Sequence, residues 1–205
     1  MTIVAVARVF NKKGEVFISA CSDSEISGDE TRDVGIVDAT KIIKVKDALI
    51  CVSGSGPILE VLEDLAEDKK FLRGLDLTTK KGVRMIGEQA YGCLKYVYES
   101  IPVNIASDDV VGPLLIATPI NIWVVQHDLV TYEIEQVYAA GVGADTFLGA
   151  FDAFVQKTED FDHETLDKIL KDAVQITNKR VLHCGGKVHI VHAIKKEPPK
   201  KKKRK

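Results

Sequence analysis

The order in which strand-like and helix-like hydrophobic patterns follow one another is the feature that most constrains the fold of this chain. Two β-branched runs, residues 2–9 and 15–21, are joined by a short turn that ends at Gly14, and they predict an N-terminal hairpin. Two more short strands are expected over residues 41–45 and 48–53. The sequence therefore begins with strands before any helical pattern appears.

Helical spacing begins after Pro57, a residue suited to the first turn of a helix. Ile58, Leu62 and Leu65 recur with a period that predicts an amphipathic helix. A second helix is expected to start near Thr78 or Thr79. Its buried face should consist of Val83, Ile86, Ala90, Leu94 and Val97.

The second half of the chain repeats the order of strands and then helices. Four runs predict a β-meander, over residues 114–117, 120–126, 129–134 and 135–140. Helical spacing then returns twice, first at Phe147, Ala150, Phe151 and Phe154, and again at Leu166, Ile169, Leu170, Ala173 and Val174 after the capping candidate Asp162. Residues 187–192 predict a closing strand.

Two sheets enclosed between two pairs of helices would use every one of these elements. We therefore predict an α+β fold, an αββα four-layer sandwich. The length of the chain favours one domain with a full hydrophobic core, over residues 1–194.

Residues 195–205 differ from the rest of the chain in charge. This segment holds eight of the 28 Lys and Arg residues and one of the 30 acidic residues, which leaves 20 basic against 29 acidic residues elsewhere. It has no large apolar side chain to bury, so we expect a disordered basic tail. The acidic remainder argues against a nucleic-acid-binding domain. The tail itself is similar to a nuclear-localisation signal, and it could equally contact nucleic acid through phosphates.

Cysteine and histidine spacing favours neither a disulfide framework nor a metal centre. Cys21, Cys51, Cys93 and Cys184 are scattered without close pairing. A second set, His183, Cys184, His189 and His192, lacks the short paired spacings of zinc ligands, and strand alternation puts His189 and His192 on opposite faces. We expect no metal and no cofactor.

Hydrophobicity along the chain indicates the compartment. No apolar run reaches the ~18–20 residues that a membrane span needs, and the first residues lack the pattern of a signal peptide. We expect no membrane association and a cytoplasmic location, or a nuclear one if the basic tail is a localisation signal.

Six short segments resemble, in the same order, segments of the family of proteasome β subunits and HslV. Residues 2–6 (TIVAV) resemble its first strand, residues 22–28 (SDSEISG) its Gly-Asp-Ser-Arg-Ala-Thr-Ser-Gly segment, and residues 41–45 (KIIKV) the strand opened by its active-site lysine. Residues 50–56 (ICVSGSG) match its Phe-Ala-Gly-Ser turn, residues 141–143 (GVG) its Gly-Ser-Gly, and residues 180–186 (RVLHCGG) its Arg-Asp-x-x-Ser-Gly-Gly. The resemblance implies an N-terminal-nucleophile (Ntn) hydrolase fold.

The resemblance also implies catalytic roles for four residues. In this family an N-terminal threonine is the nucleophile, and its free α-amine, with an unperturbed pKa of roughly 7.7–8.0, is the base. Thr2 would take this role after removal of Met1. Lys41 would tune the site electrostatically, Asp23 would pair with or orient Lys41, and the amide of Gly54 would stabilise the tetrahedral intermediate.

Each of these residues has a structural alternative. Thr2 is otherwise an ordinary β-branched strand residue, Lys41 a solvated lysine, and Asp23 and Gly54 residues of turns. Direct alignment of the first strand puts Met1, and not Thr2, at the nucleophile position, and a slip of one residue turns a strand side chain to the opposite face.

Two supporting positions of the family also differ. Its assisting serine corresponds to Val142. Its aspartate corresponds to Val181, or to Asp172 if the HslV spacing to Asn178 is used. These replacements favour a non-catalytic alternative.

By resemblance, the chain is expected to be a subunit of a self-compartmentalising threonine peptidase. Such a subunit forms a homo-oligomeric ring or stacked rings, hydrolyses polypeptide substrates and usually depends on an unfoldase ATPase. The first alternative is a catalytically degenerate protein of the same fold with a structural, assembly or partner-binding role. The second is a binding protein that holds nucleic acid or an import receptor through residues 195–205.

Overall fold

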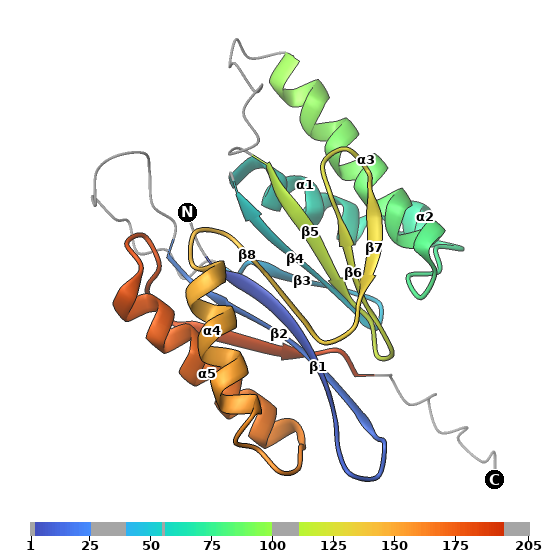
Figure 1. Cartoon of the computed structure of the whole chain (residues 1–205). Coiled ribbons are helices and arrows are strands. Elements are labelled where there is room, and N and C mark those ends of the chain that lie inside the picture. The colour runs from blue at the N-terminus through green and yellow to red at the C-terminus, as the bar shows by residue number, and fades with distance from the viewer. Residues whose placement is uncertain (1–2, 26–39, 55, 100–110, 195–205) are drawn as a thin grey trace, which may run out of the picture.

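Two antiparallel β-sheets lie face to face, with helices on the outer face of each (Figure 1). The computed structural model describes residues 3–25, 40–54, 56–99 and 111–194. The first sheet, sheet A, has the strand order β8-β1-β2-β9. Its strands are β1 (Val4–Phe10), β2 (Val16–Asp23), β8 (Val137–Ala140) and β9 (Val188–His192). The first two form the predicted N-terminal hairpin.

The second sheet, sheet B, has the strand order β3-β4-β5-β6-β7. Its strands are β3 (Ile42–Val45), β4 (Ala48–Gly54), β5 (Val111–Ala117), β6 (Ile122–Val125) and β7 (Thr131–Ile134). An irregularity interrupts the β4–β5 pairing between Val52 and Gly54. Gly54 still pairs with Val111 beyond it, and α1 begins two residues later, at Gly56.

Two layers of helices enclose the sheets. Sheet B is covered by α1 (Gly56–Glu67) and α3 (Lys80–Glu99), and sheet A by α4 (Ala144–Val155) and α5 (His163–Arg180). The carboxylate of Asp162 accepts a hydrogen bond from the Thr165 amide, so the predicted cap of α5 is confirmed.

Three apolar layers separate the four layers of secondary structure. In β1 the side chains of Val4 and Val6 belong to the cluster between the two sheets, while Ala5 and Ala7 belong to the cluster beneath α4 and α5. Strand alternation explains why this run is apolar at every position. A third cluster, which includes Ile58, Leu62, Val83, Ile86 and Ala90, lies between sheet B and its helices. The predicted αββα sandwich is confirmed.

The predicted meander over residues 114–140 is wrong at its last strand. β5, β6 and β7 pair consecutively in sheet B, but β8 crosses to sheet A and pairs with β1, from Val4↔Ala140 to Ala7↔Val137. The hydrophobic pattern of a strand shows which of its faces are buried, but it does not show which sheet contains its hydrogen-bonding partner. Because Ala139 and Ala140 are both buried, on opposite faces, either sheet would have satisfied the sequence.

A four-residue helix, α2 (Lys69–Leu72), was not predicted. It is too short to show helical periodicity, and its one local signal is Asp68, whose carboxylate accepts from the amides of Lys70 and Phe71. The four buried positions expected in α3 up to Leu94 are confirmed. The side chain of Val97 lies outside the described part of the chain, as do residues 195–205 and residues 26–28 of the segment 22–28.

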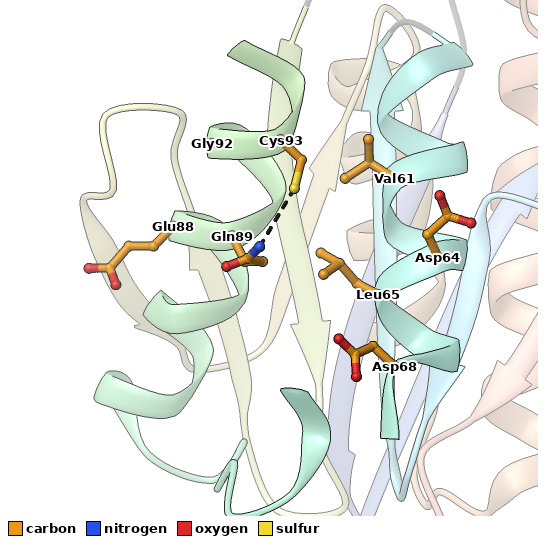
Figure 2. A pocket seen from close by; sticks show the side chains of 8 residues that line it. All are labelled: Val61, Asp64, Leu65, Asp68, Glu88, Gln89, Gly92 and Cys93. Carbon is orange, nitrogen blue, oxygen red and sulfur yellow. Dashed lines mark hydrogen bonds between the residues drawn. The ribbon is translucent and has the colours of Figure 1, made fainter. Parts of the chain in front are cut away.

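The two helices on sheet B do not close tightly over each other. A groove of about 590 Å³ runs between α1 and α3 (Figure 2). Val61 and Leu65 face it from α1, and Gly92 and Cys93 from α3. By contrast, α4 and α5 bury the stacked rings of Phe147 and Phe151, with centroids 6.0 Å apart, against sheet A.

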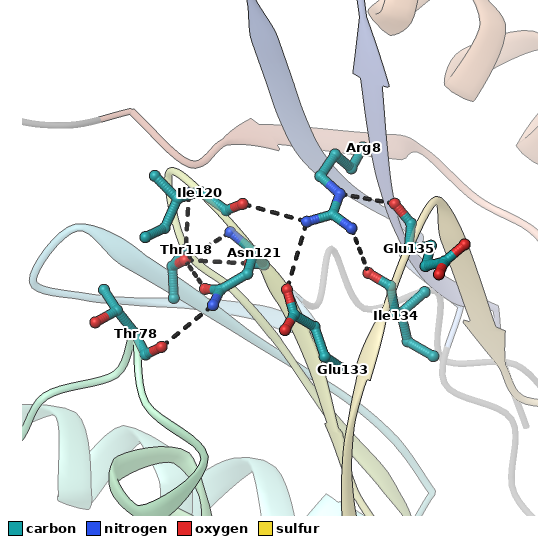
Figure 3. A network of polar contacts seen from close by, with 8 residues as sticks. All are labelled: Arg8, Thr78, Thr118, Ile120, Asn121, Glu133, Ile134 and Glu135. Atoms are coloured by element: carbon teal, nitrogen blue, oxygen red, sulfur yellow. Dashed lines mark hydrogen bonds and ion pairs between the residues drawn. The ribbon is translucent and has the colours of Figure 1, made fainter.

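Arg8 joins the two sheets near the hairpin end of β1 (Figure 3). Its guanidinium donates to the carbonyls of Glu135 at 2.7 Å, Ile134 at 3.1 Å and Ile120 at 3.3 Å. Glu133 lies 3.5 Å away. Ile134 ends β7, Glu135 lies in the connection from β7 to β8, and Ile120 lies in the β5–β6 turn. The Arg8 side chain therefore holds the connection by which the chain passes from sheet B to sheet A.

Candidate active site

A buried ion pair joins the two sheets beside the start of β1. Asp23 is the last residue of β2, and Lys41 directly precedes β3. The Lys41 Nζ lies 2.6 Å from Asp23 Oδ1, and the two side chains are only 7% and 0% exposed. The pairing of these two predicted site residues is therefore present in the structure.

The Asp23 carboxylate is held from three parts of the chain. Its Oδ1 accepts from the Ile3 amide at 3.2 Å as well as from Lys41, and its Oδ2 accepts from the Gly185 amide at 3.0 Å. The Asp23 amide in turn donates to the Ile3 carbonyl. Because every one of these groups is on a different element, the carboxylate is fixed in position and its buried oxygens are satisfied.

The Lys41 ammonium is fixed in the same way. Besides Asp23, it donates to the Glu25 carbonyl at 2.6 Å. Burial lowers the pKa of Lys41 below its ordinary value, and the Asp23 charge opposes this shift. A lysine in this setting is a positive charge at a defined point in a poorly solvated site, where its field on neighbouring groups is stronger than in water.

Cys184 lies beside this pair, although it was expected only as a scattered cysteine or a weak metal candidate. It is buried, and burial, assisted by the negative charge of Asp23, raises the pKa of its thiol to about 12. It is therefore a neutral thiol near pH 7. The signal that could have identified it was already in the sequence, since Cys184 occupies the serine position of the segment 180–186.

Gly143 brings the loop before α4 into contact with the same region. A Cβ atom at this position would lie 2.5 Å from Thr177 Cγ2, 2.9 Å from Cys184 Sγ and 3.2 Å from Ile3 Cβ. No side chain fits there, so the glycine is required for this close approach. The segments 141–143 and 180–186 thus meet at Ile3.

Gly54 ends β4, and α1 begins at Gly56. The Val52 amide donates to the Lys41 carbonyl at 3.3 Å, which places the end of β4 within one strand spacing of Lys41. Gly54 therefore lies at the same end of sheet B as the ion pair. Thr2, the predicted nucleophile, lies outside the described residues.

The positions that differ from the family lie around the same end of sheet A. Val142 precedes Gly143 and is 47% exposed. Val181 is the C-cap of α5, and Asp172 is half-buried within α5.

The histidines of the predicted last strand have structural neighbours. His192 contacts the Ser19 hydroxyl at 2.9 Å and the Asp167 carboxylate at 3.3 Å, and its ring lies 4.3 Å from that of His163. Within the described ranges, no group of three or more His, Cys, Asp or Glu side chains is arranged to hold a metal ion. None of the helices in that part of the chain is long and apolar enough to cross a membrane.

Comparison with known proteins supports the fold. No protein-family model and no curated protein matches the chain. Among solved structures, Thiobacillus denitrificans BPH matches with a TM-score of 0.71 and 21% identity, covering 93% of this chain and 97% of its own. The same protein in complex with epoxomicin gives a TM-score of 0.70 at 21% identity and the same coverage. HslV from Trypanosoma brucei gives a TM-score of 0.63 and 15% identity, covering 93% and 98%. The chain therefore has the proteasome-like Ntn-hydrolase fold.

Proposed function

We propose that this chain is a subunit of a self-compartmentalising threonine peptidase in which Thr2 becomes the N-terminal nucleophile when Met1 is removed. The observation that carries the proposal is the buried Asp23–Lys41 pair, fixed against the first described residue of the chain. A buried ion pair costs desolvation free energy that a pair of apolar residues would avoid, so it is weak evidence for stability alone.

Covalent connectivity brings Thr2 to this pair. Thr2 is bonded to the Ile3 nitrogen, and that nitrogen donates to Asp23 Oδ1 at 3.2 Å. This contact of the residue that follows Thr2 supports a role for the ion pair in the proposed reaction. If instead Met1 stands at the position of the family nucleophile, removal of Met1 leaves no residue at that position.

The proposed reaction is hydrolysis of a peptide bond in two steps. The Thr2 hydroxyl attacks the substrate carbonyl, and its proton passes by way of the free α-amine to the leaving amine, so that an ester forms as the C–N bond breaks. Water then attacks the ester, releases the acid and returns the proton to the threonine oxygen. Lys41 would favour the neutral amine through its positive charge, and the Gly54 amide would donate to the oxyanion.

Assembly and partners are part of this proposal. A homo-oligomeric ring or stacked rings would enclose the site, and an unfoldase ATPase would deliver polypeptide substrates. The HslV neighbour supports the proposal by fold. Size-exclusion chromatography with light scattering tests it, because a monomer at micromolar concentration would contradict an enclosed chamber.

Intact-protein mass spectrometry before and after incubation with epoxomicin is the direct test of catalysis, since a neighbouring structure holds that compound. We expect the mass to lack Met1 and to increase by one inhibitor. Thr2→Ala should abolish the adduct, whereas Thr158→Ala, at a remote position after α4, should retain it. A chain that keeps Met1 and forms no adduct would show that it is not a threonine peptidase.

The second candidate function is a catalytically degenerate subunit that serves assembly or partner binding. The valines at 142 and 181 favour it, because neither side chain can supply the family's hydroxyl or carboxylate. The basic tail offers such a protein a contact with nucleic acid or an import receptor. Ring assembly without an adduct would support this candidate, and loss of nucleic-acid binding on neutralising residues 200–203 would identify the contact.

A further inference from the structure

The groove between α1 and α3 is lined by apolar and acidic residues. In Figure 2 the side chains of Val61, Leu65 and Asp68 point toward α3, whereas the carboxylates of Asp64 and Glu88 lie at the outer edges. Val61 and Leu65 form one apolar side, and both are half-buried and pack against the core cluster between sheet B and its helices. Asp64, Asp68 and Glu88 line the same groove. A volume of about 590 Å³ is large enough for several side chains of a bound segment.

Gly92 keeps one wall of the groove open. A Cβ atom at Gly82 would meet the Asp76 backbone and one at Gly87 would meet Val125 at 2.6 Å, so packing explains both of these glycines. A Cβ atom at Gly92 would meet no atom of the described residues within 4 Å. Glycine within a helix costs about 1 kcal/mol relative to alanine, and packing in the monomer does not explain this cost. An occupant approaching the α3 backbone would explain it.

The carboxylates of Asp68 and Glu88 can each accept further hydrogen bonds from positively charged donors. Asp68 caps α2 through Oδ1, and Glu88 contacts Arg84 through Oε1 at 3.1 Å, so each interaction engages one oxygen of the carboxylate. A carboxylate can accept at both oxygens. The groove therefore favours an extended segment with several positive charges.

We propose that residues 195–205 of the same chain dock in this groove. They carry eight basic residues and one acidic residue, whereas the rest of the chain has the opposite charge balance. The long methylene stems of lysine can cover Val61 and Leu65 while the ammonium groups reach the acidic side chains of the groove. This docking does not depend on the proposed peptidase activity.

The path from β9 to the groove is short enough for this segment. Ala193 follows β9, donates its amide to the Ile18 carbonyl and belongs to the cluster between the sheets. β9 ends at His192, opposite Ser19 of β2, and Ala193 shares its cluster with Ala117 and Ile122, at the ends of β5 and β6 in sheet B. The outer face of that sheet carries α1 and α3. One sheet layer of about 10 Å and one helix layer of similar thickness must be passed. Eleven extended residues span up to about 36–40 Å.

Cys93 provides a reporter within the groove. Of the four cysteines, Cys21, Cys51 and Cys184 are buried, and Cys93 is partly exposed. We expect a thiol reagent to modify Cys93 about tenfold faster when Lys200, Lys201, Lys202 and Lys203 are all changed to Gln in the full chain, since labelling follows the fraction of molecules with an open groove. Salt at about 1 M should have the same effect on the unmodified chain, because it screens exposed charges.

Matched changes on the body separate this docking from a general loss of charge. Asp64→Asn should accelerate modification of Cys93, whereas Asp152→Asn, an exposed position on α4, should not. Cys93→Ser should remove the signal and so assign it. Equal rates in the unmodified chain, the lysine variant and Asp64→Asn would overturn the proposal.

Disulfide formation distinguishes the same chain from a second copy. In the full chain with Lys202→Cys, mild oxidation should link the introduced thiol to Cys93 within one molecule, seen as an unshifted band on a non-reducing gel and a linked peptide by mass spectrometry. A dimer joined through Cys93 would overturn docking within the chain and assign the groove to the tail of a second copy. Gly92→Ala should raise the melting temperature and lower the yield of the link; a higher melting temperature with an undiminished yield would overturn the role of the open helix surface.

Discussion

Lys41 and Arg8 are cations near opposite ends of β1, and each connects sheet A to sheet B. Lys41 does so through a fully buried carboxylate and one carbonyl. Arg8 does so through three carbonyls, with a carboxylate that is 46% exposed nearby. Both arrangements fasten the sandwich, but their chemistry differs, because a lysine shifts its pKa on burial and an arginine remains charged.

This difference separates a candidate site from a structural clamp within one fold. The guanidinium of Arg8 has the planar donor geometry that three converging carbonyls require. A pair of apolar residues of similar volume could fill the space of Asp23 and Lys41 without the cost of desolvating two charges. The comparison therefore predicts that replacing Asp23 or Lys41 lowers both stability and the proposed activity, whereas replacing Arg8 lowers stability alone.

The largest effect is expected from breaking the buried pair on one side. Lys41→Met should lower the free energy of unfolding by about 3–5 kcal/mol, because it leaves Asp23 buried without its counter-charge. Lys44→Met, at an exposed position in β3, should change it by less than about 0.5 kcal/mol. Urea unfolding at neutral pH measures both.

The double change Lys41→Met with Asp23→Leu sharpens this prediction. If the pair serves a site and not the fold, the double variant should be more stable than Lys41→Met alone. A double variant that is less stable would mean that Asp23 anchors Ile3 and Gly185 for folding, as its hydrogen bonds permit.

Arg8→Met should have the second largest effect. The three carbonyls lose a charged donor, which is expected to cost about 2–3 kcal/mol in the free energy of unfolding. Arg8→Lys should recover less than half of this loss, since one ammonium cannot reproduce the planar fork. Epoxomicin labelling of Thr2, if present, should be unchanged in both variants. Lost labelling in a folded Arg8→Met protein would break the distinction between clamp and site.

Glu133→Gln tests whether the Arg8 cluster depends on its carboxylate. The ion pair is long at 3.5 Å, and Glu133 is 46% exposed, so its loss should cost less than about 1 kcal/mol. The effect should shrink further in high salt. A cost equal to that of Arg8→Met in urea unfolding would show that the carboxylate, and not the carbonyls, holds the guanidinium.

The sequence predicted the fold because each layer depends on local periodicity. The two-sided burial of β1 and the helical spacing of residues such as Ile58 and Leu62 fix the elements and their buried faces without reference to distant partners. The sheet membership of β8 depends on a partner more than a hundred residues away, β1, and on the carbonyls that Arg8 gathers. No local pattern contains that information.

The candidate site was predictable only in part for the same reason. Asp23 and Lys41 stand in segments with a family resemblance, and the structure brings them together as expected. The place of Cys184 depends on the close approach of Gly143 to Ile3, a contact between three distant segments. Whether Thr2 acts as a nucleophile depends on chemistry at the first residues of the chain, and it stays a prediction.

The smallest effect is expected at an acid-sensitive contact between α5 and β9, on the side of the molecule that contains sheet A. Desolvation, and then the charge of His192, lower the pKa of His163, while Asp167 and Asp162 oppose the shift. The folded protein thus binds fewer protons here than the unfolded chain. Its contribution to stability is present above the ordinary pKa of 6.5 and is lost as the pH falls through the lower, folded-state pKa.

Hydrogen exchange measures this effect in each half separately. When the pH falls from 7 to 5, the exchange rates of amides in β9 and the first turn of α5, corrected for the intrinsic rate, should rise relative to those in β5 and β6. The strands β5 and β6 lie outside the contact between His163 and His192. His163→Gln should remove the pH dependence, because a neutral side chain leaves no proton to bind at that position. An equal gain in both sheets would show that acid acts through a contact shared by the halves. Lys41 and Asp23 would then be the pair to examine, since they join both sheets.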